Sequence, residues 1–214
     1  MTRLYRCRAS LSEVAATFGA DAIAGTLWQP TVWPGSRALI VRAHGDRRRI
    51  ELATWGLPWQ PGTERLATCL RDMMAPIGFG DRSDPPERCL IVLESFALPA
   101  GAPRSRTQSW FGLSDRPLVG WAGILREMPG RGPCFAGIAA PANDLIAPLS
   151  PTMPALLEPA EDQTWLTAPL AELGNCRRPH DADSMYAEWT DDPWPRPISK
   201  PRKMPGQGGS VSRH

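Results

Sequence analysis

Residues 88–96, RCLIVLESF, decide the fold of this 214-residue chain. The stretch is mainly apolar and contains β-branched and aromatic side chains, which is typical of a buried strand. Two further apolar stretches follow, SWFGL at 109–113 and LVGWAGIL at 118–125, and proline-containing turns separate the three. We therefore predict that these stretches are strands of one antiparallel set, on which the rest of the domain is built.

Short helices and further strands are predicted on either side of this set. Ser10 and Glu13 form a capping-box pattern, Ser-x-x-Glu, which predicts a helix through Phe18 that stops at Gly19. The other elements that we expect from the spacing of apolar residues are strands at 38–42, 50–55 and 134–140 and helices at 63–74, 158–166 and 168–173.

Composition favours a single domain followed by a tail. With 42% hydrophobic residues, the chain can bury one sizeable core. Residues 181–192 carry five acids and no Lys or Arg, whereas residues 195–214 carry five Lys or Arg and no acid. We predict a domain over 1–178, and over 179–214 the acidic stretch and then a basic, Pro- and Gly-rich tail that is disordered. We interpret the tail as inert; contact with the acidic stretch or with nucleic acid is the alternative.

The sequence gives no support for a membrane span, a metal site or a disulfide framework. No stretch reaches the roughly 18 apolar residues of a membrane span, and we do not expect a secretory leader. The five cysteines are widely spaced, without a CxxC pair or a histidine at ligand spacing. The three histidines, His44, His180 and His214, are expected to be exposed rather than catalytic. We expect a cytoplasmic monomer that uses no metal and no cofactor.

Seven pieces of the sequence occur in a characteristic order: MxxLYR, PTVWPGSRALIVR, TWGLP, RCLIVLESFA, SWFGL, WAGILR and ANDLIAPLSPTMPALLEPAEDQTWL. In this order and spacing, from Met1 to about Arg178, the chain resembles the SOS-response-associated peptidase (SRAP) family, the abasic-site processing proteins. The resemblance implies a compact, β-rich α+β domain with peripheral short helices and a positively charged groove for single-stranded DNA. That fold agrees with the strands predicted above.

The chemistry that this resemblance implies depends on a cysteine directly after the initiator methionine. Its free α-amine and thiol attack the ring-opened aldehyde of an abasic site and close a thiazolidine ring, and the family is also implicated in removing its own leading residues. This chain has Thr2 at that position. A hydroxyl is a much poorer ring-closing nucleophile than a thiol at neutral pH, so the amine of Thr2 can form only a reversible adduct.

The resemblance aligns two more active-site residues of the family with side chains of this chain that cannot perform the same proton transfer. The active-site Glu of the family matches Leu98, and its His, in APxHxxMPxxL, matches Ser150 in APLSPTMPALL. Leucine exchanges no proton, and a serine without a neighbouring base is a poor general base. The Asn-x-Arg that holds the DNA backbone in the family falls on Cys69 to Arg71, which keeps the Arg and loses the Asn; residues 64–66 are a competing register.

These substitutions in a framework that otherwise follows the family predict a SRAP-like pseudoenzyme, which binds single-stranded or abasic DNA without forming the thiazolidine. Arginines are expected to contact phosphates and tryptophans to stack on bases; the DNA-binding candidates are Arg71, Cys69, Arg3, Arg6, Trp55 and Trp59. Core packing is the favoured interpretation for Trp110, Trp121 and Trp165. Two alternatives are an active enzyme or autopeptidase that uses the amine of Thr2, and a scaffold that binds no DNA.

Overall fold

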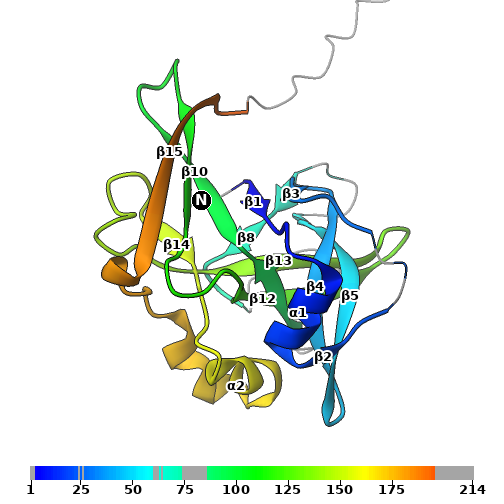
Figure 1. The fold of residues 1–214 in the computed structure, drawn as a ribbon. Helices are drawn as coiled ribbons and strands as arrows, with labels where there is room; N and C mark the ends of the chain where they lie inside the picture. The colour runs from blue at the N-terminus through cyan, green and yellow to red at the C-terminus, as the bar shows by residue number, and fades with distance from the viewer. Residues whose placement is uncertain are drawn as a thin grey trace, which may run out of the picture.

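The computed structural model describes residues 3–23, 25, 27–59, 63, 65–73 and 86–195. They form a β-rich α+β domain of two main sheets with short peripheral helices, as predicted (Figure 1). The smaller sheet has five strands in the order β15 (Met185–Pro193), β11 (Thr107–Leu113), β10 (Ser95–Ala100), β1 (Tyr5–Arg6) and β3 (Thr31–Val32).

The larger sheet has eight strands and wraps the other side of the core. Its order is β14 (Thr152–Pro154), β13 (Gly132–Pro141), β12 (Val119–Met128), β9 (Glu87–Leu93), β4 (Arg37–His44), β5 (Arg47–Trp55) and β2 (Ala20–Asp21), with β8 (Cys69–Leu70) paired to β13. A small two-stranded sheet joins β6 (Leu57–Pro58) and β7 (Leu66–Ala67). The helical segments are α1 (Leu11–Phe18), α2 (Glu161–Thr167) and the 3₁₀ turns η1 (Leu170–Arg177) and η2 (Ala182–Ser184).

The RCLIVLESF stretch supplies one strand to each main sheet. β9 lies in the larger sheet between β12 and β4, and β10 lies in the smaller sheet between β1 and β11. The chain changes sheets at Glu94, whose carboxylate accepts hydrogen bonds from the backbone N–H of Arg8 at 2.9 Å and from its Nε at 2.8 Å. The prediction of a single antiparallel set is therefore wrong in part, because β9 and β12 belong to one sheet and β10 and β11 to the other.

Helix α1 forms as the capping-box pattern predicts. The hydroxyl of Ser10 accepts a hydrogen bond from the N–H of Glu13 at 3.3 Å, and the Glu13 carboxylate accepts one from the N–H of Ser10 at 2.7 Å. Gly19 ends the helix with a φ of 56°, a left-handed conformation that suits glycine. Val14 and Phe18 are buried, so the helix covers part of the core.

The helix predicted for residues 63–74 is wrong in the part that the structure describes. That part contains β7, which pairs with β6, and β8, which runs parallel to β13. The carbonyl of Thr68, between the two strands, accepts hydrogen bonds from Trp55 Nε1 at 3.0 Å and from the N–H of Gly137, also at 3.0 Å. Pairing with distant strands therefore outweighs the local helical pattern.

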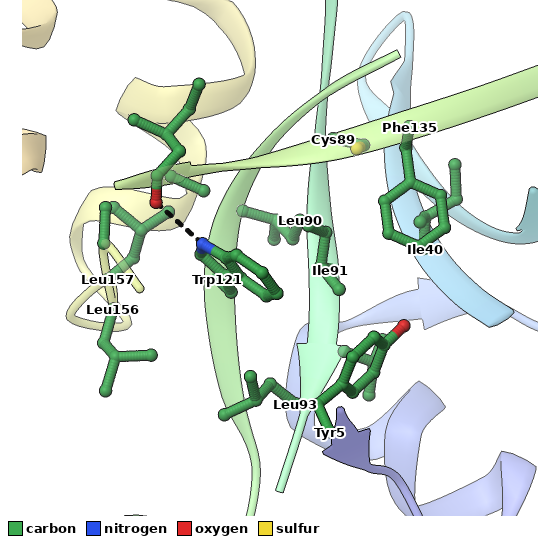
Figure 2. Packing of buried hydrophobic residues seen from close by; sticks show 14 of the residues in the cluster. Tyr5, Ile40, Cys89, Leu90, Ile91, Leu93, Trp121, Phe135, Leu156 and Leu157 are labelled. Atoms are coloured by element: carbon green, nitrogen blue, oxygen red, sulfur yellow. Dashed lines mark hydrogen bonds between the residues drawn. The ribbon is translucent and has the colours of Figure 1, made fainter. Parts of the chain in front are cut away.

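Aromatic rings fill the space between the two sheets. Tyr5, Trp55 and Trp121 meet edge to face, with ring centroids 4.9 to 6.2 Å apart, and Figure 2 shows Tyr5 and Trp121 in the same core as the apolar side chains of β9. Trp121 Nε1 donates a hydrogen bond to the carbonyl of Ile138 at 2.8 Å, which fixes the orientation of the ring. The core-packing interpretation is confirmed for Trp110, Trp121 and Trp165, each of which is at most 1% exposed.

The acidic stretch belongs to the folded domain. Residues 185–193 form β15, which pairs antiparallel with β11 at the edge of the smaller sheet, and Figure 1 shows this strand in orange along one side of the domain. The domain boundary predicted after residue 178 needs correction, because these residues complete a sheet. The disorder predicted for 195–214 concerns residues that, from 196 onward, lie outside the described residues.

Helix α2 places a carboxylate at the edge of the core. Asp162 is 5% exposed and lies against Gly120, and its Oδ1 has no hydrogen-bond partner among the described residues. Nη1 of Arg48 lies 3.8 Å from its Oδ2. Burial outweighs this pairing and raises the pKa of the Asp162 carboxyl from 3.8 to about 6. The folded state therefore favours the neutral acid between these two values.

Because its folded-state pKa is raised, Asp162 is expected to lower stability as the pH rises from 3.8 to about 6. The Asp162→Asn variant keeps the shape of the side chain and removes the titration. Near neutral pH its free energy of unfolding is expected to exceed that of the wild type by on the order of 1 kcal/mol, and below about pH 4 the gain is expected to vanish. Urea unfolding of both proteins across this range measures the difference; a difference that does not vary with pH would contradict the assignment.

Candidate functional site

A cavity of about 760 Å³ opens at the end of the smaller sheet; we call it the N-terminal cavity. Its wall includes Arg3 before β1, the hairpin of β10 and β11 with Pro99, the loop residue Leu149, and Trp194 after β15. The strands that carry most of these residues are neighbours in one sheet, although they are far apart in sequence. The sheet therefore assembles the cavity from distant segments.

Chain neighbours of the three positions of the family chemistry line the N-terminal cavity. Each position has a direct chain neighbour in the cavity wall: Arg3 beside Thr2, Pro99 beside Leu98 and Leu149 beside Ser150. Thr2 itself lies outside the described residues. Leu98 and Ser150 are both buried. The cavity is therefore the place to which the resemblance assigns the reaction.

Neither Leu98 nor Ser150 supplies a base at this place. Leu98 lies opposite Ser109 on the neighbouring strand and packs into the main core. The hydroxyl of Ser150 donates a hydrogen bond to the carbonyl of Thr152 at 2.7 Å and accepts one from its N–H at 3.3 Å. That hydroxyl therefore stabilises the turn before β14. The one carboxylate in the described cavity wall is that of Asp191.

Arginines give the N-terminal cavity a positive charge. Arg3, Arg104 and Arg106 line it, against the single acid Asp191. All three arginines are exposed, and none forms an ion pair with an acid that the structure describes. Exposed guanidinium groups bind phosphate or carboxylate oxygens through two parallel N–H groups. The donor set of the cavity therefore suits an anion.

Two of the predicted DNA-binding arginines lie away from this cavity. Arg6 is held by its own neighbours, with its guanidinium carbon 3.5 Å from the ring centroid of Trp110 and its Nη1 3.2 Å from Glu188. Arg71 is exposed after β8, and its carbonyl accepts a hydrogen bond from the side chain of Arg177. Of the arginines that the sequence analysis named, only Arg3 lines the described cavity wall.

Of the two tryptophans expected to stack on bases, only Trp59 has an accessible ring. Trp55 is fully buried among core aromatic rings, so burial excludes a stacking role for it. Trp59 is 44% exposed, and the guanidinium carbon of Arg65 lies 5.2 Å from its ring centroid. Arg65, the cation of the competing register, is therefore associated with a surface ring.

Within the described residues, no thiol is placed to replace the family cysteine. All five cysteines are free and buried, and none lines the described part of the N-terminal cavity. Burial raises the pKa of the Cys7 and Cys69 thiols to about 12 and also raises the pKa of Cys89. The thiolate, which is the nucleophilic form, is therefore scarce at neutral pH. Cys69, a predicted DNA contact, is only 7% exposed.

The sequence pattern did not identify Arg104, Arg106 or Trp194 as site residues. It predicts a proline-containing turn between the strands at this point and assigns no role to the arginines in it. A signal was present, since PRSR at 103–106 puts two cations at the tip of a predicted hairpin. Their position near Arg3 depends on the pairing of β1 with β10, which a sequence pattern does not reveal.

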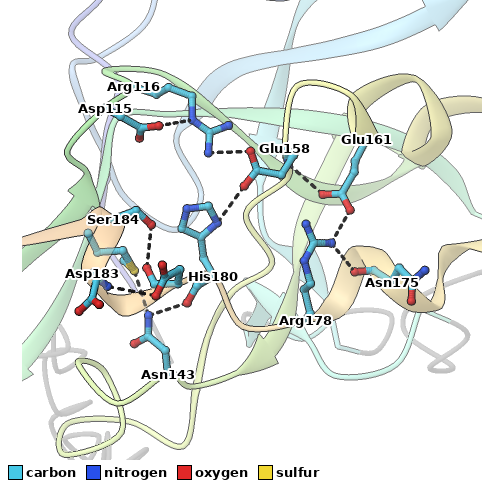
Figure 3. Close-up of polar contacts among 12 residues, drawn as sticks. Asp115, Arg116, Asn143, Glu158, Glu161, Asn175, Arg178, His180, Asp183 and Ser184 are labelled. Atoms are coloured by element: carbon cyan, nitrogen blue, oxygen red, sulfur yellow. Dashed lines mark hydrogen bonds and ion pairs between the residues drawn. The ribbon is translucent and has the colours of Figure 1, made fainter.

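A polar cluster around His180 has a structural role (Figure 3). The prediction that His180 is exposed is wrong, since it is 8% exposed and burial lowers the pKa of its ring. The Nδ1 of His180 lies 3.5 Å from the carboxylate of Glu158, which forms an ion pair with Arg116 at 3.0 Å. The backbone carbonyl of His180 accepts a hydrogen bond from the side chain of Asn143 at 2.8 Å. These contacts fasten the segment before β15 to the loop before β12 and to the start of α2.

In the ranges that the structure describes, no group of three or more His, Cys, Asp or Glu side chains is arranged to hold a metal ion. None of the helices in those ranges is long and apolar enough to cross a bilayer.

The fold and the cavity define a class of protein: a two-sheet, β-rich domain with a basic cavity beside its N-terminal strand. The family model described as SOS response associated peptidase (SRAP) matches residues 1–190, and the chain belongs to this family. No curated protein matches the chain.

Solved structures show the same fold at low sequence identity. A protein from Bordetella bronchiseptica is 19% identical, with a TM-score of 0.73 over 86% of this chain and 97% of that chain. A protein from Bacteroides thetaiotaomicron is 20% identical, with a TM-score of 0.70 over 86% of this chain and 90% of that chain. A phage-related protein from Bordetella bronchiseptica is 14% identical, with a TM-score of 0.64 over 88% and 93%.

Proposed function

We propose that this SRAP-family chain is a pseudoenzyme, which binds single-stranded or abasic DNA at the N-terminal cavity without forming the thiazolidine crosslink. The observation that carries the proposal is the composition of the cavity wall. Exposed arginines stand beside the positions at which the family chemistry requires a thiol and two proton-transfer groups, and this chain has Thr2, Leu98 and Ser150 there. Groups that can bind a DNA backbone are present, whereas the groups that react in the family are replaced.

DNA binding is supported by charge, size and shape. Arg3, Arg104 and Arg106 can contact successive phosphates, and the half-buried ring of Trp194 in the same wall can pack against a base. A volume of about 760 Å³ falls in the range of pockets that hold a nucleotide-sized group. Two of the arginines stand on a hairpin, whose paired strands limit their motion.

The absence of crosslinking follows from the bonds that a thiazolidine needs. Its ring forms when an amine and an adjacent thiol add to the same aldehyde carbon, so both nucleophiles must come from one residue. Thr2 offers an amine and a hydroxyl, and the oxygen analogue of the ring opens again readily. Leu98 can neither accept nor donate the proton that ring opening of the sugar requires.

The test of the proposal uses one labelled oligonucleotide with a single abasic site and two measurements. In native conditions the chain is expected to bind it, with an affinity that falls steeply as salt is added. On a denaturing gel after heating, no crosslinked band is expected. A heat-stable band would contradict the pseudoenzyme assignment, and a band seen only after borohydride reduction would favour the enzyme alternative that uses the Thr2 amine. Binding that is absent or insensitive to salt would favour the scaffold.

The double variant Arg104→Ala/Arg106→Ala is expected to weaken single-stranded DNA binding about tenfold and to lower the slope of log affinity against log salt by about 1.4, since each lost phosphate contact removes about 0.7. Fluorescence anisotropy over a salt series measures both. Arg49→Ala/Arg131→Ala is the matched control, because it removes two exposed arginines outside the described cavity wall. Equal losses in the two variants would mean that net charge, and not the cavity, determines binding.

A further inference from the structure

An irregularity in β15 lies at the wall of the N-terminal cavity. Residues 190–192 of β15 stand opposite the single residue Gln108 of β11, so the strand bulges here. Bulges bend a strand and change the direction of its side chains, and they are frequent next to functional sites. Asp191, in the middle of the bulge, lines the cavity, whereas its neighbour Asp192 is not part of the described wall.

Hydrogen bonds between the two strands hold the bulge in place. The hydroxyl of Thr190 donates to the carbonyl of Gln108 at 2.8 Å and accepts from the N–H of Asp192 at 3.3 Å. The side-chain amide of Gln108 donates to the carbonyl of Pro193 at 3.1 Å. The backbone on both sides of Asp191 is therefore fixed by the protein itself, which lowers the cost of using this side chain to bind a ligand.

Trp194 stands in the same wall, three residues further along the chain. Its N–H donates a hydrogen bond to the carbonyl of Arg106 at 2.7 Å. Its ring packs against the buried cluster of Leu4, Ala97 and Trp110 and is itself half-buried. An aromatic ring that is anchored on the core and still partly accessible is a platform on which a nucleobase can stack.

The carboxylate of Asp191 opposes the charge of the cavity. Arg3, Arg104 and Arg106 line the same wall, and within the described chain none of them forms an ion pair with Asp191. Beside a bound phosphate this carboxylate would be repulsive. An ionised carboxylate accepts hydrogen bonds and donates none. The part of a DNA strand that it favours is therefore a base with N–H donors, and not the backbone.

Among the DNA bases, guanine fits a carboxylate best. Its N1–H and its N2 amino group are adjacent donors, so they can form two parallel hydrogen bonds with the two carboxylate oxygens. Adenine and cytosine present one donor beside an acceptor nitrogen, and thymine presents one donor between two carbonyl oxygens, so each of these bases also brings an acceptor against the carboxylate. In a single strand this edge of the base is free to be read.

We propose that Asp191 makes the N-terminal cavity selective for guanine in single-stranded DNA. Its carboxylate accepts hydrogen bonds from N1–H and N2–H of the base, Trp194 stacks on the ring, and the arginines contact the neighbouring phosphates. This inference rests on the proposed DNA-binding function and adds a base preference to it. Phosphate contacts supply affinity that does not depend on sequence, whereas the contact of Asp191 with the base supplies the preference.

Fluorescence anisotropy with labelled thymine oligonucleotides tests the proposal. The set consists of the all-thymine strand and strands in which one central thymine is replaced by guanine, hypoxanthine, adenine or cytosine. We expect the wild type to bind the guanine strand about tenfold more tightly than the adenine, cytosine and all-thymine strands. Hypoxanthine lacks the N2 amino group of guanine, so its strand is expected to bind with intermediate affinity.

Asp191→Asn is expected to lose the guanine preference, because an amide accepts hydrogen bonds at one atom only and presents a donor at the other. It is expected to bind the all-thymine strand at least as tightly as the wild type, since a negative charge beside the phosphates is removed. Asp192→Asn is the matched control, because it makes the same charge change at the adjacent exposed residue outside the described cavity wall. It is expected to keep the preference.

The outcomes separate this inference from the proposed function. Wild-type binding without a base preference would overturn the inference and leave the DNA-binding proposal standing. A guanine preference that persists in Asp191→Asn, or that Asp192→Asn loses to the same extent, would also overturn the inference, because Asp191 would then not be the group that reads the base. Absence of binding to every strand would instead overturn the DNA-binding proposal, and the inference with it.

Discussion

Gly137→Ala is expected to destabilise the domain by about 3 kcal/mol or more, enough to prevent folding if the wild type is only marginally stable. A Cβ at this position would lie 1.9 Å from Cζ2 and 2.1 Å from Cε2 of Trp121. The ring cannot move aside easily, because its Nε1 donates a hydrogen bond to the Ile138 carbonyl and it packs edge to face with Tyr5 and Trp55. The added methyl group must therefore displace either β13 or the central aromatic cluster.

Urea unfolding followed by circular dichroism measures this effect, and Gly174→Ala is its control, because a Cβ there meets nothing within 4 Å. The control is expected to be close to neutral. Trp121→Phe removes the part of the ring that clashes, so the double variant Gly137→Ala/Trp121→Phe is expected to be more stable than the sum of the two single losses implies. Additive losses would show that the clash does not determine the cost.

Thr2→Cys is expected to produce a heat-stable crosslink to an abasic oligonucleotide that the wild type does not form. The substitution restores a thiol next to the free α-amine, and the two together close a thiazolidine without further proton transfer by the protein once the aldehyde is open. The expected change is from no detectable band to a clear band on a denaturing gel. It is the largest functional effect that we predict.

Thr2→Ser is the control for this gain, since it keeps a hydroxyl and is expected to give no heat-stable band. Mass spectrometry of the intact protein must show that Met1 has been removed, because the α-amine is otherwise part of a peptide bond. If Thr2→Cys binds the oligonucleotide with Met1 removed and still forms no crosslink, the loss of activity is not confined to the sulfur. The arrangement of the cavity itself would then differ from that which the family chemistry needs.

Elements with a local signal were predicted well. The capping box of α1, its terminal glycine and the neighbouring strands β4 and β5 each depend on residues close together in the chain. The buried tryptophans were also predicted, because large aromatic side chains in apolar stretches are usually buried in the core. Such features follow from the sequence because the contacts that stabilise them are short-range.

Features that depend on distant pairing were not predicted. The change of sheet at Glu94, the strands in place of a helix at 63–74 and the inclusion of β15 in the smaller sheet all follow from contacts between remote segments. The candidate site likewise contains positions that the sequence identifies and positions that only the fold reveals. Family resemblance located Leu98 and Ser150, whereas Arg104 and Arg106 became part of it only through the pairing of β1, β10 and β11.

The short strand β1 has a practical consequence for the crosslinking experiments. Tyr5 is paired on both sides, with Phe96 and Val32, and the carbonyl of Leu4 accepts a hydrogen bond from the N–H of Ala97 at 2.9 Å. From Leu4 onward the chain is anchored, and Arg3, directly before it, lines the N-terminal cavity. Residues of an affinity tag left ahead of Thr2 would tie its α-amine up in a peptide bond, so the crosslinking experiments need protein in which every residue before Thr2 has been removed.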